Sequence, residues 1–560
     1  MTSAISIGKQ DFASLRENHY FYVDKTDFIR QWWESGDDIT LITRPRRFGK
    51  TLNMSMLNCF FSRQYAEKGT IFEGLSIWKQ EKYRRLQGTY PVIFLSFADV
   101  KQNNYQDAVQ KIKNIIVDAY RQHRYLEQEE CFTQNEKQQM LEITEKMSNV
   151  TAQDALKNLS SYLNLLYGKK VLIFLDEYDT PMQEAYIHGY WDEFVGFMRS
   201  LFNATFKTNP YLERAVMTGI TRISKESVFS DLNNLTVITT TSDAYADCFG
   251  FTEEEVFQSL DQFGMPEKKD LVKQWYDGFC FGTHRDIYNP WSITNYLKEK
   301  KLRPYWAATS SNGLISKLLQ SASANMKEEL EKLINRQQIV VNFDEQIIFG
   351  QLEQDESAVW SLLVASGYLK VEEIEYRGLT LEPWYSLSIT NLETVSMFSN
   401  MFKSWFAAAS ANYNEFIKAL LNGDVKAMNL YMNDIALATF SNFDAGKHAS
   451  ERSQPERFYH GFVLGLLVEV RDLYEVRSNR ESGYGRYDVI LIPRNLDRDA
   501  MILEFKVKET EEKTLQETVQ KALAQIEIKK YDAELKERGI PKERIRHYGF
   551  AFEGKKVLIG

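Results

Sequence analysis

The stretch Thr43-Arg44-Pro45-Arg46-Arg47-Phe48-Gly49-Lys50-Thr51 decides how the first part of this chain folds. It lies between an apolar run, Ile39–Thr43, and a helical stretch, Leu52–Phe61. In a P-loop the glycine lets backbone N–H groups close around a phosphate, the lysine reaches the β and γ oxygens, and the hydroxyl holds Mg²⁺. Gly49, Lys50 and Thr51 fit these roles, although Arg44 stands where the motif has its first glycine. The alternative interpretation is an ordinary turn from a strand into a helix.

A second motif supports the phosphate site. The apolar run Val171–Leu175 ends in Asp176 and Glu177, which is the Walker B pattern. Asp176 is expected to hold Mg²⁺ through water, and Glu177 to orient and deprotonate the attacking water. The alternative is a buried strand that ends in two solvated acids. Two such motifs in this order, each at the end of a strand, are much harder to obtain by chance than either alone.

A third predicted strand ends at Thr218 and is followed by Gly219-Ile220-Thr221-Arg222. Thr218 is a candidate sensor of the γ-phosphate, and Arg222 is a candidate for neutralising charge that develops on it. The alternative is a helix N-cap beside a surface arginine. Arg44, Arg46 and Arg47 add positive charge in the loop, and the sequence does not decide which arginine acts as a finger.

Short apolar runs alternate with helical stretches over residues 1 to about 240. The runs are bounded and rich in β-branched or aromatic residues, as strands buried on both faces should be. Amphipathic stretches lie between them, notably Tyr105–Arg124 and Gln153–Tyr167. This alternation predicts a parallel sheet covered by helices. The predicted strands are Ile39–Thr43, Pro91–Phe97, Val171–Leu175, Ala215–Thr218 and Val237–Thr240.

The rest of the chain shows two further patterns. From about residue 250 to 440 it is mostly helical and rich in Trp and Tyr, with a small strand-containing part near 338–392. Beyond about residue 450 a new pattern predicts a separate small α/β domain. Its predicted elements are a helix Glu456–Tyr474, strands Tyr487–Ile492 and Ala500–Lys506, a helix Thr514–Lys536 and a strand His547–Phe552.

Three charged residues on the two adjacent C-terminal strands form a candidate metal site. Asp488 opens the first strand, and Glu504 and Lys506 lie on the second. Since residues two apart on a strand face the same side, Glu504 and Lys506 point together while Phe505 faces the core. Asp488 and Glu504 can then coordinate a divalent cation that activates water, with Lys506 polarising or positioning the nucleophile. The alternative is a hairpin with solvent-facing charges.

Several stretches in the first half resemble the bacterial AAA-ATPase-like family. Members of that family carry Arg-Pro-Arg-Arg-Phe-Gly-Lys at the P-loop, so Arg44 is expected in place of the first glycine. The resemblance implies ATP as cofactor and adds Arg46, Arg47 and Phe48 to the expected nucleotide-binding set. The matching stretches are Tyr22–Thr26, Ile42–Thr51, Leu175–Pro181 and Thr218–Lys225, with Trp275–Phe279 and Tyr288–Ser292 as aromatic, structural motifs of an implied helical lid.

The C-terminal constellation resembles the PD-(D/E)XK nuclease fold, in the version commonly fused to that ATPase family. The proline that names the fold is absent before Asp488, where Tyr487 stands. The resemblance implies Mg²⁺, or Mn²⁺, at the two carboxylates, and nucleic acid as substrate, with DNA favoured by family analogy. It rests on the order helix with Glu456, strand with Asp488, strand with Glu504 and Lys506, and helix with Gln525 and Tyr531. Glu456, Gln525 and Tyr531 have supporting roles in this interpretation.

The chain is therefore expected to be an α/β multidomain protein. A P-loop, parallel-sheet ATPase domain is predicted at 1–245 and a helical lid at 246–335. A helical, winged-helix-like linker region is predicted at 336–445, and a restriction-endonuclease-like α/β domain at 446–560.

Composition agrees with a large folded protein. With 560 residues, 44% hydrophobic and 26% charged, the chain is neither disordered nor collagen-like. No apolar run approaches the ~20 residues that a bilayer requires, and the first residues lack a signal-peptide pattern. Four cysteines without a close pair argue against a disulfide framework or a structural zinc site. We therefore expect a cytoplasmic protein without a membrane partner.

The net charge of −9 does not indicate nucleic-acid binding, although residues 471–560 carry 19 Lys and Arg against 17 Asp and Glu. The favoured interpretation is an ATPase whose nucleotide state positions or licenses a metal-dependent nuclease. One alternative is an ATP-dependent switch that binds nucleic acid or a partner protein and cuts nothing. Another is a nuclease whose P-loop binds ATP for assembly and hardly hydrolyses it. Assembly into a homo-oligomer is left open.

Overall fold

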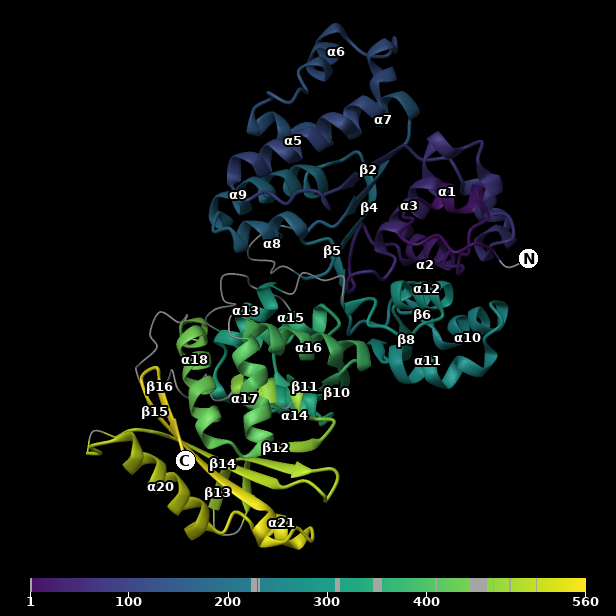
Figure 1. Ribbon diagram of the computed structural model, residues 1–560. Helices are drawn as coiled ribbons and strands as arrows, with labels where there is room; N and C mark the ends of the chain where they lie inside the picture. Colours follow the sequence, from purple (N-terminus) through teal and green to yellow (C-terminus); the bar gives the residue numbers. More distant parts are fainter. Residues whose placement is uncertain are drawn as a thin grey trace. The chain divides into compact units, whose positions relative to one another are not determined.

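The computed structural model describes most of the chain (Figure 1). The described residues are 3–222, 229, 232–307, 313–345, 355–407, 410–443, 461–466, 468–482, 485–509 and 511–560. They form two compact units, each taken by itself below. Unit 1 comprises residues 1–310 and 340–394, and unit 2 comprises residues 311–339 and 395–560. The predicted four-part division remains a prediction.

Unit 1 is built on a five-stranded, all-parallel sheet of strand order β2-β3-β4-β1-β5. Four of the five predicted strands are confirmed, and the fifth, predicted at Val237–Thr240, lies two residues earlier as β5. β1 and β3 are buried along their whole length, which explains their continuous apolar sequence. Figure 1 shows α1, α2 and α3 to one side of this sheet and α5, α7 and α9 to the other. The strands are β1 Ile39–Thr43, β2 Val92–Ser96, β3 Val171–Asp176, β4 Leu212–Gly219 and β5 Leu235–Ile238.

The helices of this α/β part follow the predicted amphipathic stretches. The prediction of helix at Tyr105–Arg124 and at Gln153–Tyr167 is confirmed by α5 and α7. The described helices are α1 Phe12–Glu17, α2 Asp27–Ser35, α3 Lys50–Phe61, α4 Glu81–Leu86, α5 Tyr105–Gln122, α6 Gln134–Leu141, α7 Asn149–Tyr167, α8 Thr180–Ile187 and α9 Trp191–Phe202.

The region after the sheet is not purely helical. Helices α10 Glu253–Gln262, α11 Lys269–Tyr276 and α12 Pro290–Glu299 accompany a small sheet of order β6-β8-β7. Its strands, β6 Phe251–Thr252, β7 Phe279–Phe281 and β8 His284–Tyr288, were not predicted, because strands this short carry too little periodicity to detect. The predicted strand-containing part near 338–392 is confirmed as β9 Ile339–Asn342, α15 Ser357–Ala365, β10 Leu369–Arg377 and β11 Glu382–Ile389.

Unit 2 contains a mixed sheet of order β12-β13-β14-β15-β16. Only β14 and β15 are parallel, and α20 Leu515–Lys529 provides the crossover that a parallel pair requires. The strands are β12 Tyr474–Ser482, β13 Gly485–Pro493, β14 Ala500–Val507, β15 Ile545–Glu553 and β16 Lys556–Ile559, and further helices are α13 Gly313–Ser321, α14 Ala324–Ile334, α16 Leu392–Trp405, α17 Ser410–Asn422, α18 Val425–Phe443 and α21 Ala533–Glu537.

Two boundaries in this unit differ from the prediction. The predicted helix through Tyr474 is wrong at its end, because strand β12 begins at Tyr474. The strand was missed since its buried residues alternate over only a few positions. The predicted helix Thr514–Lys536 is interrupted at Lys530, whose φ of 53° is left-handed and ends α20. Tyr531 therefore lies in the turn before α21 and not on one helix with Gln525.

The edge strand β16 is covered by side chains of α18. Asn429 donates to Ile559 O at 2.7 Å and accepts from Ile559 N at 2.8 Å. Asn433, one turn later, makes the same pair of bonds with Val557 at 2.7 and 2.9 Å. Two amide side chains thus replace a neighbouring strand and close an edge that would otherwise be open to pairing.

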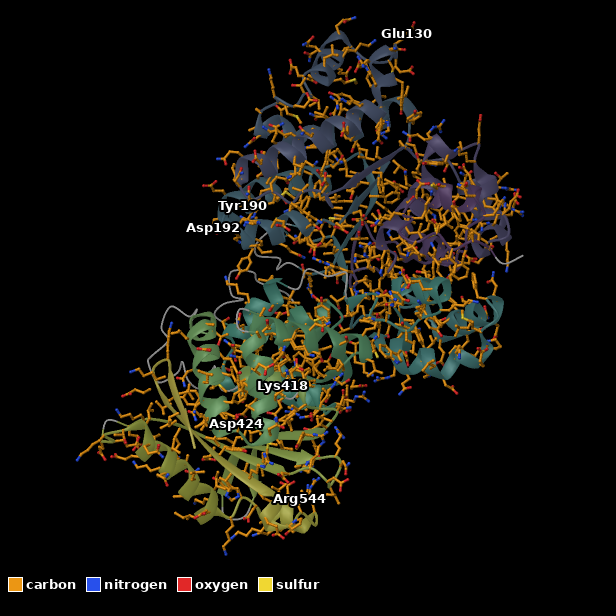
Figure 2. All side chains as sticks on the ribbon, in the orientation of Figure 1. Glu130, Tyr190, Asp192, Lys418, Asp424 and Arg544 are labelled. Carbon is orange, nitrogen blue, oxygen red and sulfur yellow. The ribbon has the colours of Figure 1, made fainter. Side chains whose placement is uncertain are left out.

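Helix α18 of unit 2 is capped by the residue before it. Asp424, labelled in Figure 2, accepts from Ala427 N at 3.0 Å at the start of α18.

Among the helices that the structure describes, none is long and apolar enough to cross a lipid bilayer.

Candidate nucleotide and metal sites

The predicted phosphate loop joins β1 to α3 at the edge of the sheet where the parallel strands end. Two of its residues have left-handed backbone, Arg47 at φ 66° and Gly49 at φ 79°, and α3 begins at Lys50. The buried Lys50 Nζ donates to Arg44 O and to Pro45 O, each at 2.8 Å. Burial lowers the pKa of Lys50 to about 8. The ammonium therefore lies inside the loop, where the loop's own carbonyl groups hold it.

Asp176, the last residue of β3, faces the start of α3. Its carboxylate accepts from Thr51 Oγ1 at 2.7 Å and from Thr218 Oγ1, on β4, at 2.6 Å. The side chain is fully buried, and burial raises its pKa. A hydroxyl and a carboxylate beside a phosphate loop are oxygen donors of the kind that Mg²⁺ prefers, so Thr51 and Asp176 fit a magnesium ion.

The predicted nuclease residues meet on two neighbouring strands of unit 2. Val489 on β13 is paired with Leu503 on β14 in an antiparallel register, and Asp488 and Glu504 are the next residues on their strands beyond this pair. Asp488 Oδ2 accepts from Phe505 N at 2.7 Å. Burial raises the pKa of both carboxyl groups, and the charge of Asp488 raises that of Glu504 further.

Gln525 on α20 connects the members of this site. Its Nε2 donates to Glu504 Oε1 and, at 3.1 Å, to Tyr531 OH, while its Oε1 accepts from Lys506 Nζ at 2.7 Å. Glu504 and Lys506 therefore share one face, as predicted. The other oxygen of Glu504, Oε2, is buried and has no hydrogen-bond partner among the described residues. Glu456 lies outside the described residues.

These observations test whether a divalent cation fits the C-terminal site. Two carboxyl groups lie close together, and the buried Oε2 of Glu504 has no hydrogen-bond partner among the residues that the structure describes. A bound cation would offset the repulsion between the two carboxylates and the burial of the unpartnered oxygen, because it binds oxygen ligands and carries the opposite charge. The residues present therefore fit Mg²⁺ or Mn²⁺.

Two family models match separate parts of the chain. Residues 6–229 match the family model described as predicted AAA-ATPase, and residues 454–560 match the PD-(D/E)XK nuclease superfamily. The chain therefore joins an N-terminal AAA-ATPase-like domain to a C-terminal PD-(D/E)XK nuclease-superfamily domain. It is also 25% identical over 550 residues, 96% of this chain and 94% of the relative, to an uncharacterized protein in the vnfD 5′ region of Azotobacter chroococcum mcd 1.

Two predicted residues of the AAA-ATPase-like domain lie at the carboxyl ends of β3 and β4. Glu177, with φ 53°, is half-buried, and its carboxylate accepts from Thr180 Oγ1 at 3.0 Å. Arg222 is half-buried shortly after β4. Thr218 is bonded to the same carboxylate as Thr51, which places it beside the candidate magnesium ligands. The catalytic and sensing roles of these residues remain predictions.

Arg44, one of the three arginines expected to add positive charge in the loop, is not exposed for contact with phosphate. Its side chain is fully buried and donates to Thr239 O at 2.6 Å, and its guanidinium lies 4.4 Å from the centre of the Phe281 ring. Burial lowers its pKa to about 9. Arg44 stands where the motif has its first glycine. Its side chain packs in the protein interior and donates to a backbone carbonyl group.

The other loop residues divide into two groups. Phe48 is buried against Phe279 and Phe281, with ring centres 4.8 and 5.3 Å away, so only its backbone is available to a nucleotide. Arg46 and Arg47 are exposed and remain candidates for contact with phosphate.

Residues beyond the parallel sheet contact the loop directly, which the sequence did not indicate. Asn289 Nδ2 and Trp306 Nε1 donate to Arg46 O at 3.3 and 3.1 Å. The Arg47 guanidinium lies 4.4 Å from the centre of the Trp291 ring. The only available signal was the Asn-Pro-Trp-Ser run, which by itself looks like a helix start.

A buried acid of the Walker B turn was also missed. Asp179 accepts from Ile220 N at 3.0 Å and from Thr221 N at 2.8 Å, and burial raises its pKa. It joins the end of β3 to the segment after β4. A Cβ atom at Gly219 would lie 2.7 Å from Asp179 Oδ1 and 2.6 Å from the Tyr178 ring, so only glycine fits there.

A cluster of acids in the lid is a weaker candidate for a metal. Carboxylate oxygens of Glu253, Asp277 and Asp286 lie within 4.8 Å of one another. Lys273 Nζ, however, bonds to Glu253 and lies 3.7 Å from Asp286. The lysine already supplies positive charge to two of the three acids.

Proposed function

We propose that this protein binds and hydrolyses ATP, and that its nucleotide state controls a divalent-metal-dependent nuclease in its C-terminal domain. Nucleic acid is the substrate of that nuclease, with DNA favoured over RNA. The observation that supports the proposal is that each of the two domains brings a lysine and at least one acidic side chain together as a set. Lys50 with Asp176 forms one set, and Lys506 with Asp488 and Glu504 forms the other.

In the ATPase half, Lys50 would exchange the carbonyl groups of the loop for the β and γ oxygens of ATP. Thr51 and Asp176 would hold Mg²⁺, which neutralises charge on the phosphates when it is bound. Glu177 lies one residue beyond Asp176 at the same sheet edge, where it would orient and deprotonate the attacking water. Arg46, Arg47 and Arg222 are the arginines that remain available to the developing charge.

In the nuclease half, Asp488 and Glu504 would hold Mg²⁺ or Mn²⁺, which supplies a water of lowered pKa and stabilises charge on the phosphate. Lys506 would position the nucleophile. The side-chain amide of Gln525 donates to Glu504 and accepts from Lys506. It thereby fixes the position of the ammonium group relative to the carboxylate.

A second candidate function is an ATP-dependent switch whose nuclease-like domain binds nucleic acid and does not cut it. It is favoured by the fact that Gln525 already occupies one oxygen of Glu504 and the ammonium of Lys506. In that case the network of hydrogen bonds would be the final state of the site and would exclude a metal.

The test is cleavage by the purified full-length protein. Plasmid, oligonucleotide and RNA are incubated with ATP, ADP or no nucleotide, and with Mg²⁺, Mn²⁺ or chelator. The proposal expects metal-dependent cleavage at a rate that differs between nucleotide states, because a nucleotide shifts a balance only if it prefers one conformation. Lys50→Ala should remove the nucleotide effect, and Glu504→Gln should remove cleavage. Binding without cleavage under every condition would support the switch instead.

A further inference from the structure

The backbone of the phosphate loop is bonded to residues far downstream in the sequence. The carbonyl oxygen of Arg46 accepts from Trp306 Nε1 at 3.1 Å and from Asn289 Nδ2 at 3.3 Å. Both donors belong to buried residues, with exposed fractions of 1% and 0%. Neither lies within residues 6–229, the part that matches the ATPase family model. The loop is therefore completed by residues that the model of the family does not include.

The direction of this carbonyl group determines what the loop offers to an anion. The preceding carbonyl groups, of Arg44 and Pro45, turn toward Lys50 Nζ, whereas that of Arg46 turns toward the two lid donors. In a trans peptide the C=O and the following N–H point in opposite directions, so the Arg47 N–H points away from the lid. Arg47 then takes left-handed backbone, the conformation that turns successive N–H groups toward one concave side.

The lid donors are themselves held in place. Glu393, which is fully buried, accepts from Trp306 N at 3.1 Å and from Ser292 Oγ at 2.7 Å. The Trp306 ring packs against the rings of Phe279 and Tyr368, with centres 5.3 and 5.4 Å away. The indole N–H therefore has little freedom to leave Arg46 O.

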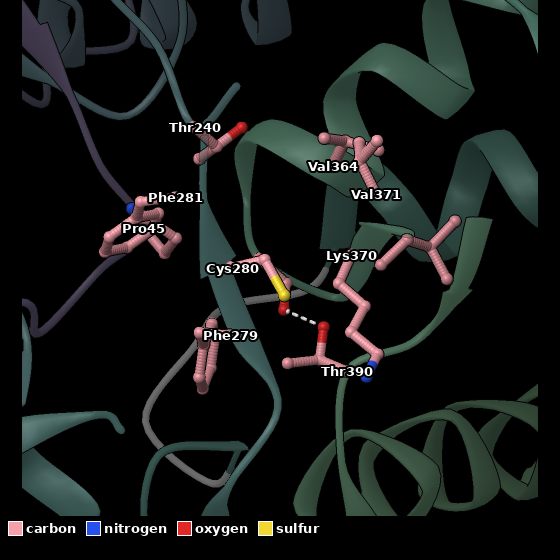
Figure 3. A pocket seen from close by; sticks show the side chains of 11 residues that line it. Pro45, Thr240, Phe279, Cys280, Phe281, Val364, Lys370, Val371 and Thr390 are labelled. Atoms are coloured by element: carbon pink, nitrogen blue, oxygen red, sulfur yellow. Dashed lines mark hydrogen bonds between the residues drawn. The ribbon is translucent and has the colours of Figure 1, made fainter. Parts of the chain in front are cut away.

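The strand-containing segment also packs on the loop, next to Pro45. A Cβ atom at Gly367 would lie 2.7 Å from Pro45 Cγ, so glycine is required for this approach. Figure 3 shows Pro45 with Phe279, Cys280 and other residues around a cavity of about 10 Å³, which holds at most one water molecule. The cavity is too small for a ligand, and its size shows how closely the loop is packed.

We propose that Trp306 and Asn289 are positioning residues for the nucleotide phosphates. They act through the Arg46 carbonyl group, which they hold toward themselves by hydrogen bonds. The Arg47 N–H then points the opposite way, where it is available to phosphate oxygens. This inference rests on the proposed function, because it concerns the same ATP site. It adds that nucleotide affinity depends on the region beyond the parallel sheet, and that a matching P-loop sequence alone does not form the site.

Two conservative variants of the full-length chain test the inference. Trp306→Phe keeps an aromatic ring and removes only the indole donor. Asn289→Asp keeps the oxygen that caps α12, which accepts from Trp291 N at 2.9 Å, and removes the amide donor. Trp384→Phe is the matched control, because Trp384 lies on β11 with Arg377 4.7 Å from its ring centre and makes no part of the loop.

The readouts are the dissociation constants of ATP and ADP and the unfolding midpoint with and without nucleotide. Each test variant should raise both dissociation constants about two- to tenfold, the value of one neutral hydrogen bond. The midpoint without nucleotide should change little in Trp306→Phe and fall in Asn289→Asp, which buries a carboxylate beside a carbonyl oxygen. In both variants the nucleotide-induced rise in midpoint should shrink. The control variant should bind nucleotide like the wild type.

The outcomes separate this inference from the proposed function. If the wild type binds ATP and Lys50→Ala does not, but both test variants keep wild-type affinity, the inference is wrong and the ATP site stands. A lower midpoint without nucleotide, with unchanged affinity, would show a purely structural role and would also overturn it. A wild type without affinity for ATP would overturn the proposed function, and the inference with it.

Discussion

Replacement of Glu504 by glutamine should stabilise the metal-free protein and at the same time remove its response to metal. The side chain is 2% exposed, its Oε2 has no partner among the described residues, and the neighbouring Asp488 repels its charge. Glutamine keeps the shape and the acceptor that Gln525 uses, while its amide can donate toward Asp488. Replacing an unpaired buried acceptor by a donor and removing one repelled charge should contribute about 1–3 kcal/mol to the free energy of unfolding.

The assay is thermal unfolding with chelator and with Mn²⁺. For a unit of this size, 1–3 kcal/mol corresponds to a rise of roughly 2–10 °C in the midpoint of Glu504→Gln in chelator. Mn²⁺ at about a hundred times its dissociation constant should stabilise the wild type by about 2.7 kcal/mol, and the variant by much less because it lacks a ligand. The order of the two midpoints should therefore reverse, or nearly so, when Mn²⁺ is added.

Glu509→Gln is the matched control. Glu509 is an exposed acid two residues beyond β14, and its substitution should change the free energy of unfolding by less than about 0.5 kcal/mol in either condition. A lower midpoint of Glu504→Gln in chelator would mean that protein groups already compensate the carboxylate. Equal stabilisation of wild type and Glu504→Gln by Mn²⁺ would show that Glu504 is not a ligand.

Four further predictions concern single side chains. Lys50→Ala should weaken ATP binding roughly ten- to hundredfold in a titration, because it removes a charge-assisted contact of ~1.5–3 kcal/mol, and unchanged affinity would remove the P-loop assignment. Glu177→Gln should keep ATP bound and slow its hydrolysis, since an amide accepts no proton, and equal rates would make Glu177 a surface acid. Lys506→Ala should retain or tighten Mn²⁺ binding in calorimetry while cleavage falls, and equal loss of metal in this variant and in Glu504→Ala would contradict its separate role. His123 is buried with its pKa lowered to about 4, so between pH 6.5 and 4 the unfolded chain takes up a proton that the folded protein does not. The free energy of unfolding should therefore fall by up to about 1.4 kcal/mol per pH unit in this range, more steeply than in His123→Asn.

The sequence by itself determined the parallel sheet and which side chains meet at the two candidate sites. Strands buried on both faces must be continuously apolar, so β1 and β3 were visible as uninterrupted runs. Parallel strands end at one edge, so motifs that follow them had to meet there, as Thr51 and Asp176 do at 2.7 Å. The two-residue period of a strand likewise placed Glu504 and Lys506 on one face before any coordinates were known.

Short or polar elements were less accessible to sequence analysis. β12 alternates over too few buried positions to be distinguished from the end of a helix, and the break at Lys530 depends on one left-handed residue that no glycine or proline marks. The separation of Tyr531 from the helix of Gln525 followed from that break. Local conformations of this kind are chosen by tertiary packing, which outweighs weak intrinsic preference.

Only the tertiary structure decided the use of individual polar side chains. Arg44 and Arg46 are nearly adjacent in the loop, yet the first is buried on carbonyl groups of a neighbouring segment and the second is exposed. Whether an arginine faces solvent or the interior depends on acceptors such as Thr239 O, which lies 195 positions away in the chain. The bond from Trp306 to Arg46 O spans 260 positions. Such contacts leave no local pattern, because hydrogen bonds select partners by distance and direction in space and not by spacing along the chain.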